Sequence, residues 1–202
     1  KGFITPSVPF AERWFIDMIE ILQQIDENIL LFIQEYIRQD WMDGFWKTIT
    51  HLGDGGVFWI ILALILLIPK KTRGAGVSAL LALGIGALIT NVAIKNIVAR
   101  IRPYDTITEL VLLIERQHDF SFPSGHTCAS FAAAYALYRT LPRKWGIACI
   151  ILAALIALSR LYVGVHYPSD VLGGLAVGLF AGWAGWKLQE KIAQAVSKKR
   201  SS

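Results

Sequence analysis

Long hydrophobic segments separated by short polar stretches make up most of the chain after residue 48. Five of them are nearly free of charged residues over lengths that approach the roughly 20 residues needed to cross a bilayer core. They cover residues 55–69, 77–94, 124–138, 145–159 and 169–186, and we expect the first to begin earlier, near Thr48. The pattern predicts an all-α fold, an integral membrane bundle with five transmembrane helices. Because several segments are short, we expect the polar residues at their ends to belong to the same helices.

The segment 12–39 has a different pattern, because apolar residues recur there at helical spacing and polar residues cover the other face. The apolar positions are Phe15, Met18, Leu22, Ile25, Ile29, Phe32 and Tyr36, and the polar ones are Asp17, Glu20, Gln24, Asp26, Glu27 and Glu35. Each carboxylate would cost roughly 2.5–3.5 kcal/mol near the bilayer centre. We therefore expect one or two amphipathic helices on the outer membrane surface, with a sixth, partly polar span as the alternative. We expect no cleavable secretory signal, because the first 40 residues are too charged.

The chain divides into an amphipathic segment (1–47), a membrane bundle (48–187) and a basic tail (188–202). Lys and Arg residues follow the first span, join the third to the fourth, and follow the fifth. They are Lys70, Lys71, Arg73, Arg139, Arg143, Lys144, Lys187, Lys191, Lys198, Lys199 and Arg200. Since such residues concentrate on the cytoplasmic side, we expect these loops and the C terminus in the cytoplasm.

The composition adds little to this picture. The chain is 54% hydrophobic and carries a formal net charge of +5. A basic chain can indicate nucleic-acid binding. Here the Lys and Arg residues cluster at the ends of apolar segments, so we expect a lipid bilayer as the partner and no nucleic acid.

A second group of cations lies at the opposite ends of the spans: Lys95, Arg100, Arg102 and Arg160. These residues lie on the side opposite to the one where most Lys and Arg residues concentrate, which suggests that they have a functional role. Lys95 and Arg102 are seven residues apart, close to two helical turns, so they share a face. Arg contacts phosphate oxygens in pairs and Lys supplies a point charge, so such cations can stabilise phosphoryl transfer. The alternative is contact with lipid head groups, which we expect for Arg100 and Arg116.

The motif Pro123-Ser124-Gly125-His126 opens the third span. Free N–H groups and the positive end of the helix dipole favour an anion there. His126 suits a general acid that protonates a leaving alkoxide. The alternative is a simple helix start capped by Ser124.

His166 and Asp170 are four residues apart, so they share a face of a helix. Pro168 between them predicts a turn into the fifth span, with Asp170 in its first turn. The carboxylate can accept the Nδ1 proton of His166 and leave Nε2 free to attack. The alternative is a structural histidine beside a helix cap.

Together these motifs resemble the three-part signature of the type 2 phosphatidic acid phosphatase superfamily, over about residues 48–187. Their order and internal spacing agree with it at every signature position: Lys95, Arg102, Pro103, Pro123, Ser124, Gly125, His126, Ser159, Arg160, His166 and Asp170. The resemblance implies hydrolysis of a lipid phosphate or diphosphate through a phosphohistidine, without metal or other cofactor.

By resemblance, His166 is the nucleophile, Asp170 orients it, and His126 protonates the leaving group and later helps to activate water. The residues expected to hold the phosphate are Lys95, Arg102, Ser124, Gly125 and Arg160. The implied substrates include phosphatidic acid, phosphatidylglycerophosphate and undecaprenyl diphosphate. We expect a bacterial cell membrane protein with its catalytic face outward.

Two other functions would use the same residues. A lipid-phosphate binding or transport protein would hold the head group without hydrolysis, although simple anion binding needs neither His166 nor Asp170. A phosphotransferase would pass the phosphoryl group to an acceptor other than water. The loop 103–123, which includes Asp119, is expected to be solvated, and His51 and Asp54 are expected to form a turn into the membrane.

Overall fold

The computed structural model describes residues 10–201, and every regular element among them is a helix. The elements are α1 (Phe10–Phe32), η1 (Ile33–Ile37), α2 (Asp40–Leu52), η2 (Asp54–Gly56), α3 (Val57–Leu67), α4 (Arg73–Ala87), η3 (Leu88–Ile94), α5 (Lys95–Val98), α6 (Pro103–Thr106), α7 (Gly125–Thr140), α8 (Arg143–Tyr162) and α9 (Pro168–Ser201). The predicted all-α fold is confirmed.

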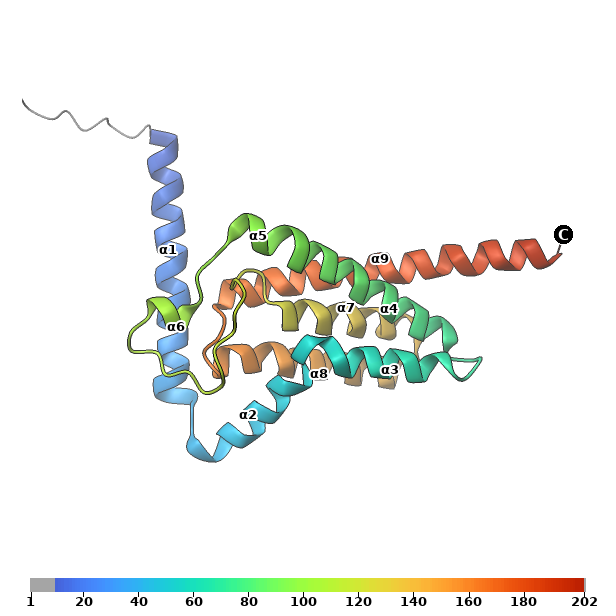
Figure 1. The fold of residues 1–202 in the computed structure, drawn as a ribbon, viewed down its shortest axis with the longest axis horizontal. Helices are drawn as coiled ribbons and strands as arrows, with labels where there is room; N and C mark the ends of the chain where they lie inside the picture. Colours follow the sequence, from blue (N-terminus) through green and yellow to red (C-terminus); the bar gives the residue numbers. More distant parts are fainter. Residues whose placement is uncertain (1–9, 202) are drawn as a thin grey trace, which may run out of the picture.

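Helix α7 lies at the centre of the bundle and packs against α4, α8 and α9 (Figure 1). Its inner positions carry small side chains, among them Ala132, Ala133, Ala134 and Ala136, all fully buried. Small side chains allow helix backbones to approach closely where lipid offers no hydrophobic driving force. Larger residues, including Trp59 and Ile156, fill the space between α3, α7 and α8.

Three glycines of α9 form the close contact with α7. A Cβ atom at Gly174 would lie 2.5 Å from the carbonyl oxygen of Ser124, and one at Gly178 would lie 2.7 Å from that of Cys128. At Gly182 it would lie 2.8 Å from the carbonyl oxygen of Ala132. The four-residue spacing of these glycines therefore serves helix packing.

Among the residues that the structure describes, three helices are long and apolar enough to cross a membrane: Arg73–Thr106, Arg143–Tyr162 and Pro168–Lys199. The first of these segments continues through η3 and α5, so Lys95 belongs to a span, as expected. Helix α5 ends at Val98, so Arg102 does not share a helical face with Lys95 as the spacing predicted. Helices α2 and α3 are bent by 45° and make a fourth candidate if they count as one span. Helix α7 has 16 residues and is shorter than the others. A multi-pass membrane protein is supported, whereas the predicted count of five spans is not established.

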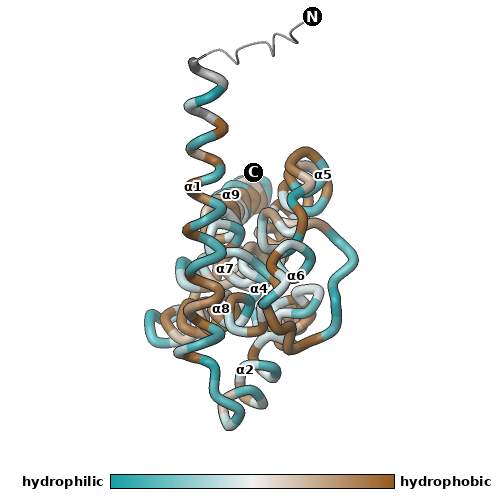
Figure 2. The backbone as a smooth tube through the Cα atoms, turned by 90° about the vertical axis from the view of Figure 1, so that its left-hand side faces the viewer, coloured by the Kyte–Doolittle hydropathy of each residue, from teal (hydrophilic) through white to brown (hydrophobic). Residues whose placement is uncertain are grey.

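Helix α1 crosses the end of the bundle rather than running along it (Figure 1). Hydrophilic and hydrophobic turns alternate along it (Figure 2), and it is not among the candidate spans. The predicted apolar stripe does not face the bundle: Met18 and Leu22 stay about half exposed, whereas Asp26 is 1% exposed. The helix therefore packs through Asp26 together with the fully buried Leu30, and the predicted apolar stripe stays exposed. An interfacial position for α1 stays a prediction.

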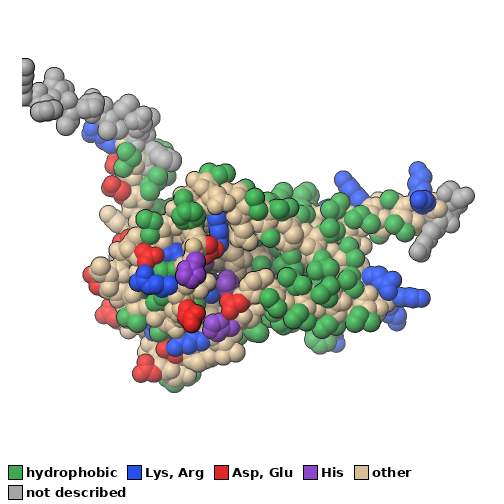
Figure 3. All heavy atoms as spheres, in the orientation of Figure 1, with side chains coloured by type: hydrophobic (Ala, Val, Ile, Leu, Met, Phe, Trp, Pro, Cys, Tyr) green, Lys and Arg blue, Asp and Glu red, His purple; other side chains and the backbone are tan. Residues whose placement is uncertain are grey.

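The two ends of the bundle differ in charge. Hydrophobic side chains cover its long sides, and the end near α1 gathers histidine, acidic and basic side chains (Figure 3). The other end carries Lys and Arg side chains (Figure 3). Helix α9 continues to Ser201, so the basic residues after position 187 lie on the last turns of the same helix.

Candidate active site

The three motifs meet at the mixed-charge end of the bundle. Lys95 lies at the start of α5 and Arg102 immediately before α6. His126 is in the first turn of α7, Arg160 in the last turn of α8, and Asp170 in the first turn of α9, as Pro168 predicted. All the predicted site residues are thus brought to one end of the fold.

His166 lies in the connection between α8 and α9 and is 1% exposed. Its Nε2 is 3.4 Å from Nη1 of Arg102. Its Nδ1 is 3.5 Å from Oδ2 of Asp170 and 3.4 Å from the hydroxyl of Ser121. Burial lowers the pKa of His166 to about 3, with Asp170 opposing this effect and Arg102 adding to it. The imidazole is therefore neutral near pH 7, with Nε2 facing the cations.

The low pKa of His166 predicts a pH dependence of stability. An unfolded histidine binds a proton below about pH 6.5, and folded His166 does so only near pH 3, so stability falls as the pH drops through this window. Between pH 7 and pH 5 we expect a loss on the order of 1–2 kcal/mol. Thermal unfolding in detergent should show a weaker pH dependence for His166→Asn than for the parent. His118→Asn, which changes an exposed residue, should keep the parent's slope; equal slopes in all three proteins would contradict the assignment.

Asp170 is fully buried and saturated with hydrogen bonds. Its Oδ2 accepts from the Ser121 hydroxyl at 2.5 Å and from the Tyr167 N–H at 2.9 Å. Its Oδ1 accepts from Nη1 of Arg100 at 2.8 Å. The carboxylate is thereby held rigidly beside His166.

Arg100 does not have the lipid-contacting position that we expected for it. Its Nη2 donates to Oδ2 of Asp26 at 2.7 Å, and Nη1 reaches Asp170. Asp26 also accepts from the Ser169 N–H at 2.9 Å. Arg100 therefore links α1 to the carboxylate that faces His166, and this link explains why the polar face of α1 is buried.

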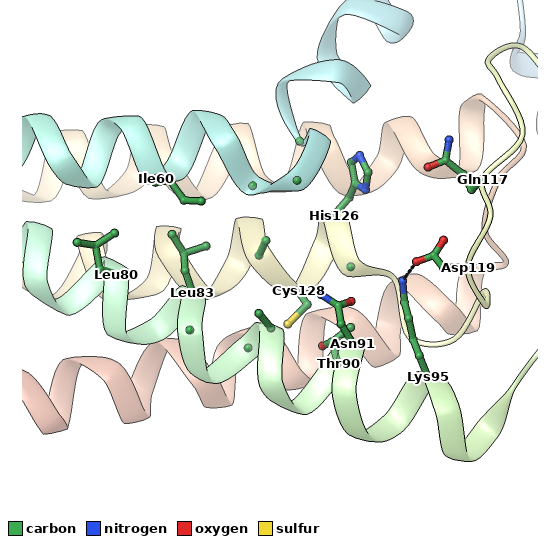
Figure 4. A pocket seen from close by; sticks show the side chains of 18 of the residues that line it. Ile60, Leu80, Leu83, Thr90, Asn91, Lys95, Gln117, Asp119, His126 and Cys128 are labelled. Atoms are coloured by element: carbon green, nitrogen blue, oxygen red, sulfur yellow. Dashed lines mark hydrogen bonds and ion pairs between the residues drawn. The ribbon is translucent and has the colours of Figure 1, made fainter.

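Lys95 and Arg102 share one carboxylate, that of Asp119. Nη2 of Arg102 donates to Oδ1 of Asp119 at 2.6 Å, and Nζ of Lys95 donates to Oδ2 (Figure 4). Burial opposes ionisation, but the hydrogen bonds and charges of Lys95 and Arg102 prevail and lower the pKa of Asp119 to about 2. Asp119 is exposed, as expected for this loop, but its pairing with the two site cations was not foreseen. Its carboxylate lies between two cations in a position that suits a phosphate.

Arg160 is 1% exposed and only partly paired. Its Nη1 donates to the Thr50 hydroxyl at 2.5 Å, whereas Nε and Nη2 have no hydrogen-bond partner among the described residues. Buried donors are nearly always satisfied, so unpaired guanidinium N–H groups favour an anion beside them.

Ser124 and Gly125 begin α7 next to these cations. The Ser124 hydroxyl accepts from the N–H of Thr127 at 3.4 Å. The Ser124 side chain therefore caps α7, which was the alternative to a role in anion binding. A Cβ at Gly125 would lie 3.6 Å from Nζ of Lys95. The start of α7 thus lies against Lys95, where helix N–H groups can add to an anion site.

His126 contacts a carboxylate that we expected to form only a turn. Its Nε2 is 2.9 Å from Oδ1 of Asp54, and Oδ2 of Asp54 is 2.8 Å from Nδ1 of His51. His51 and Asp54 do flank the turn between α2 and α3, and they also belong to the site. In the sequence, the three-residue spacing of His51 and Asp54 beside glycines indicated that the two side chains could interact. It could not reveal that His126, 72 residues from Asp54, is also a partner.

A cavity of about 620 Å³ joins the charged groups to an apolar groove. Its polar end contains Lys95, Arg102, Asp119 and His126. It continues between α3 and α4, where Ile60 faces Leu80 and Leu83 (Figure 4). Among the side chains that the structure describes, no three of His, Cys, Asp or Glu form a group that could hold a metal ion. The cavity suits a molecule with an anionic head and an apolar tail.

Residues 75–194, more than half of the chain, match the model of the PAP2 superfamily. The chain belongs to the PAP2 superfamily. This agrees with the resemblance drawn from the three motifs.

Relatives of this PAP2 protein include the undecaprenyl-diphosphatase of Sulfolobus acidocaldarius, 33% identical over 81% of this chain and 79% of the relative. The lipid A 4'-phosphatase of Bacteroides thetaiotaomicron is 32% identical over 87% of this chain and 81% of the relative. A crystal structure of a transmembrane PAP2-type phosphatidylglycerolphosphate phosphatase from Bacillus subtilis has a TM-score of 0.68 and 32% identity. It covers 85% of this chain and 88% of that one.

Proposed function

We propose that this protein is a lipid phosphate phosphatase that acts through a phosphohistidine intermediate on His166. The observation that carries the proposal is the buried, neutral His166, whose Nε2 faces the guanidinium of Arg102. The partly unpaired Arg160 supports it, because a phosphate would satisfy the free donors.

In the first step the Nε2 lone pair of His166 attacks phosphorus, and the bond from phosphorus to the leaving oxygen breaks. His126 gives its proton to that oxygen. Lys95, Arg102, Arg160 and the first N–H groups of α7 hold the other phosphate oxygens, where negative charge is stabilised. The phosphate takes the place that the carboxylate of Asp119 has in the free protein.

In the second step water attacks phosphorus, His126 takes a proton from the water, and the P–N bond breaks. Nε2 of His166 regains its lone pair and phosphate leaves. No metal takes part in these steps. Asp170 remains ionised throughout and stabilises the charge that develops on His166.

The apolar groove between α3 and α4 supports a lipid substrate, because its lining residues can contact a hydrocarbon tail. The named relatives remove phosphate from undecaprenyl diphosphate, lipid A and phosphatidylglycerolphosphate. We propose a phosphate or diphosphate carried on such a lipid, with phosphatidic acid, phosphatidylglycerophosphate and undecaprenyl diphosphate as the first candidates.

We also propose an orientation in which the catalytic end faces outward from a bacterial cell membrane and the C terminus lies in the cytoplasm. The Lys and Arg side chains at the far end of the bundle support it (Figure 3). Labelling of single cysteines at the two ends in intact cells tests this orientation.

The decisive experiment measures phosphate release by purified protein in detergent, with excess chelator, from the three candidate lipids. We expect release from at least one lipid. With a lipid carrying labelled phosphate, an alkaline quench should preserve label on the peptide that contains His166, because a P–N bond withstands alkali and breaks in acid.

Three results would contradict the proposal. Binding without release would favour a lipid-phosphate binding or transport protein. Transfer of label to a second lipid instead of water would favour a phosphotransferase. Activity that chelator abolishes and divalent cations restore would contradict the metal-free mechanism.

A further inference from the structure

The geometry points to Asp54 as a positioning residue for His126, held in place by His51. This inference rests on the proposed function, because it assigns to Asp54 the state in which His126 exchanges protons. Oδ1 of Asp54 accepts from Nε2 of His126, and Oδ2 accepts from Nδ1 of His51. The carboxylate therefore selects the Nε2–H tautomer of His126 and leaves Nδ1 for the leaving group and water.

The turn that carries Asp54 is shaped around the His126 ring. A Cβ at Gly53 would lie 2.6 Å from Cδ2 of His126, so only glycine leaves room for the imidazole. Gly55 and Gly56 have φ values of +57° and +69°, which favour glycine and reverse the chain there. Packing and hydrogen bonding thus act on the same side chain from one turn.

His126 also stands between two cavities. The first is the amphiphilic cavity described above, and the second, of about 470 Å³, is lined by Lys47, His51, Asp54 and Glu115 among others. His126 lines both. The charged residues in the lining of the second cavity allow it to supply the water of the second step without a path through the apolar groove.

The site therefore contains two histidine–carboxylate pairs with different tasks. Asp170 faces Nδ1 of His166 and leaves Nε2 for attack on phosphorus, whereas Asp54 faces Nε2 of His126 and leaves Nδ1. In the first step Nδ1 of protonated His126 gives its proton to the leaving oxygen as the P–O bond breaks. In the second step the neutral Nδ1 takes a proton from water as the P–N bond breaks. Asp54 stays ionised and stabilises the imidazolium.

The test uses leaving groups of different basicity. Asp54→Asn should lower hydrolysis of phosphatidic acid by about 10²–10³-fold, since its alkoxide needs the proton that general acid catalysis supplies. With an alkylated 4-nitrophenyl phosphate the leaving phenolate needs no proton. The first release of nitrophenolate should then fall less than about tenfold, and a burst with accumulated phosphohistidine should appear, because the water step still needs His126.

Matched variants separate positioning from structure. Asp105→Asn removes an exposed carboxylate of α6 that pairs with Arg116 at 2.7 Å, and it should behave like the parent. Adding Asp54→Asn to His126→Asn should cost little more than His126→Asn alone, because the two residues act as a unit. Asp54→Glu, which keeps an acceptor, should recover part of the phosphatidic acid activity that Asp54→Asn loses.

Equal losses on both substrates, no burst, or additive losses in the double variant would overturn the inference. If Asp54→Asn fails to fold, His126→Asn and Asp54→Glu are used in its place, and hydrolysis of phosphatidic acid is compared with release of nitrophenolate in the same way. If the parent is active, loss of His166 abolishes that activity and Asp54→Asn has no effect, the role of Asp54 is rejected and the proposed function stands. A parent inactive on every lipid would reject the proposed function itself.

Discussion

Replacing His166 with asparagine should abolish phosphate release, with a loss of roughly 10³–10⁶-fold. Removing a nucleophile from a preorganised site leaves only the binding and charge stabilisation of the remaining groups. Asparagine is a suitable replacement because its amide can still donate to Asp170 and Ser121, which lie near Nδ1 of the histidine. Phosphate release and labelling of the protein after an alkaline quench are measured together.

The matched control for that experiment is His118→Asn, which changes an exposed histidine of the loop before α7. It should retain the activity of the parent. Thermal unfolding of both variants shows whether each remains folded. Substantial release by folded His166→Asn would exclude His166 as the nucleophile and direct attention to His126.

Gly178→Ala should destabilise the bundle. The new Cβ would lie 2.7 Å from the carbonyl oxygen of Cys128 and 3.0 Å from Cβ of Phe131, so α9 and α7 must move apart. Overpacking of this kind costs about 1–3 kcal/mol, and sometimes more. Thermal unfolding in detergent should show a decrease in Tm of about 3–10 °C, since 1 kcal/mol corresponds to roughly 2–4 °C in a chain of this size.

Gly84→Ala is the control for the packing argument. A Cβ at Gly84 would have no atom within 4 Å, and alanine favours a helix over glycine by up to about 1 kcal/mol. We therefore expect Gly84→Ala to leave Tm unchanged or to raise it slightly. A Gly178→Ala protein as stable as the parent would mean that the contact between α7 and α9 has more room than the structure indicates.

The apolar segments predicted most of the helices well. The segments 145–159 and 169–186 lie within α8 (Arg143–Tyr162) and α9 (Pro168–Ser201). Long apolar runs can meet their backbone hydrogen bonds in lipid only as helices, which makes this pattern a reliable guide. The pattern missed the division of the first segment into α2 and α3, because Gly53, Gly55 and Gly56 interrupt the helix there.

The surroundings of the site were less predictable. Asp119 and Asp54 both lie in turns or loops, where a carboxylate is usually solvated, and their partners are distant in sequence. Asp26 was assigned to the polar side of a surface helix, yet it is buried against Arg100. The local sequence pattern therefore does not predict which acidic residue will pair with which basic residue or histidine.

The amino-acid sequence was sufficient for the helical class, the membrane setting and the PAP2 membership. These depend on the order of apolar residues and on short motifs, which are local properties of the chain. The partners of the catalytic groups required the packed structure: Asp54 beside His126, Asp119 between Lys95 and Arg102, and Arg100 between Asp26 and Asp170. Each of these contacts joins residues that are 17 or more positions apart in the sequence. Local sequence patterns do not specify such contacts, because they form only when the packed helices bring their connecting turns and loops to the same end of the bundle.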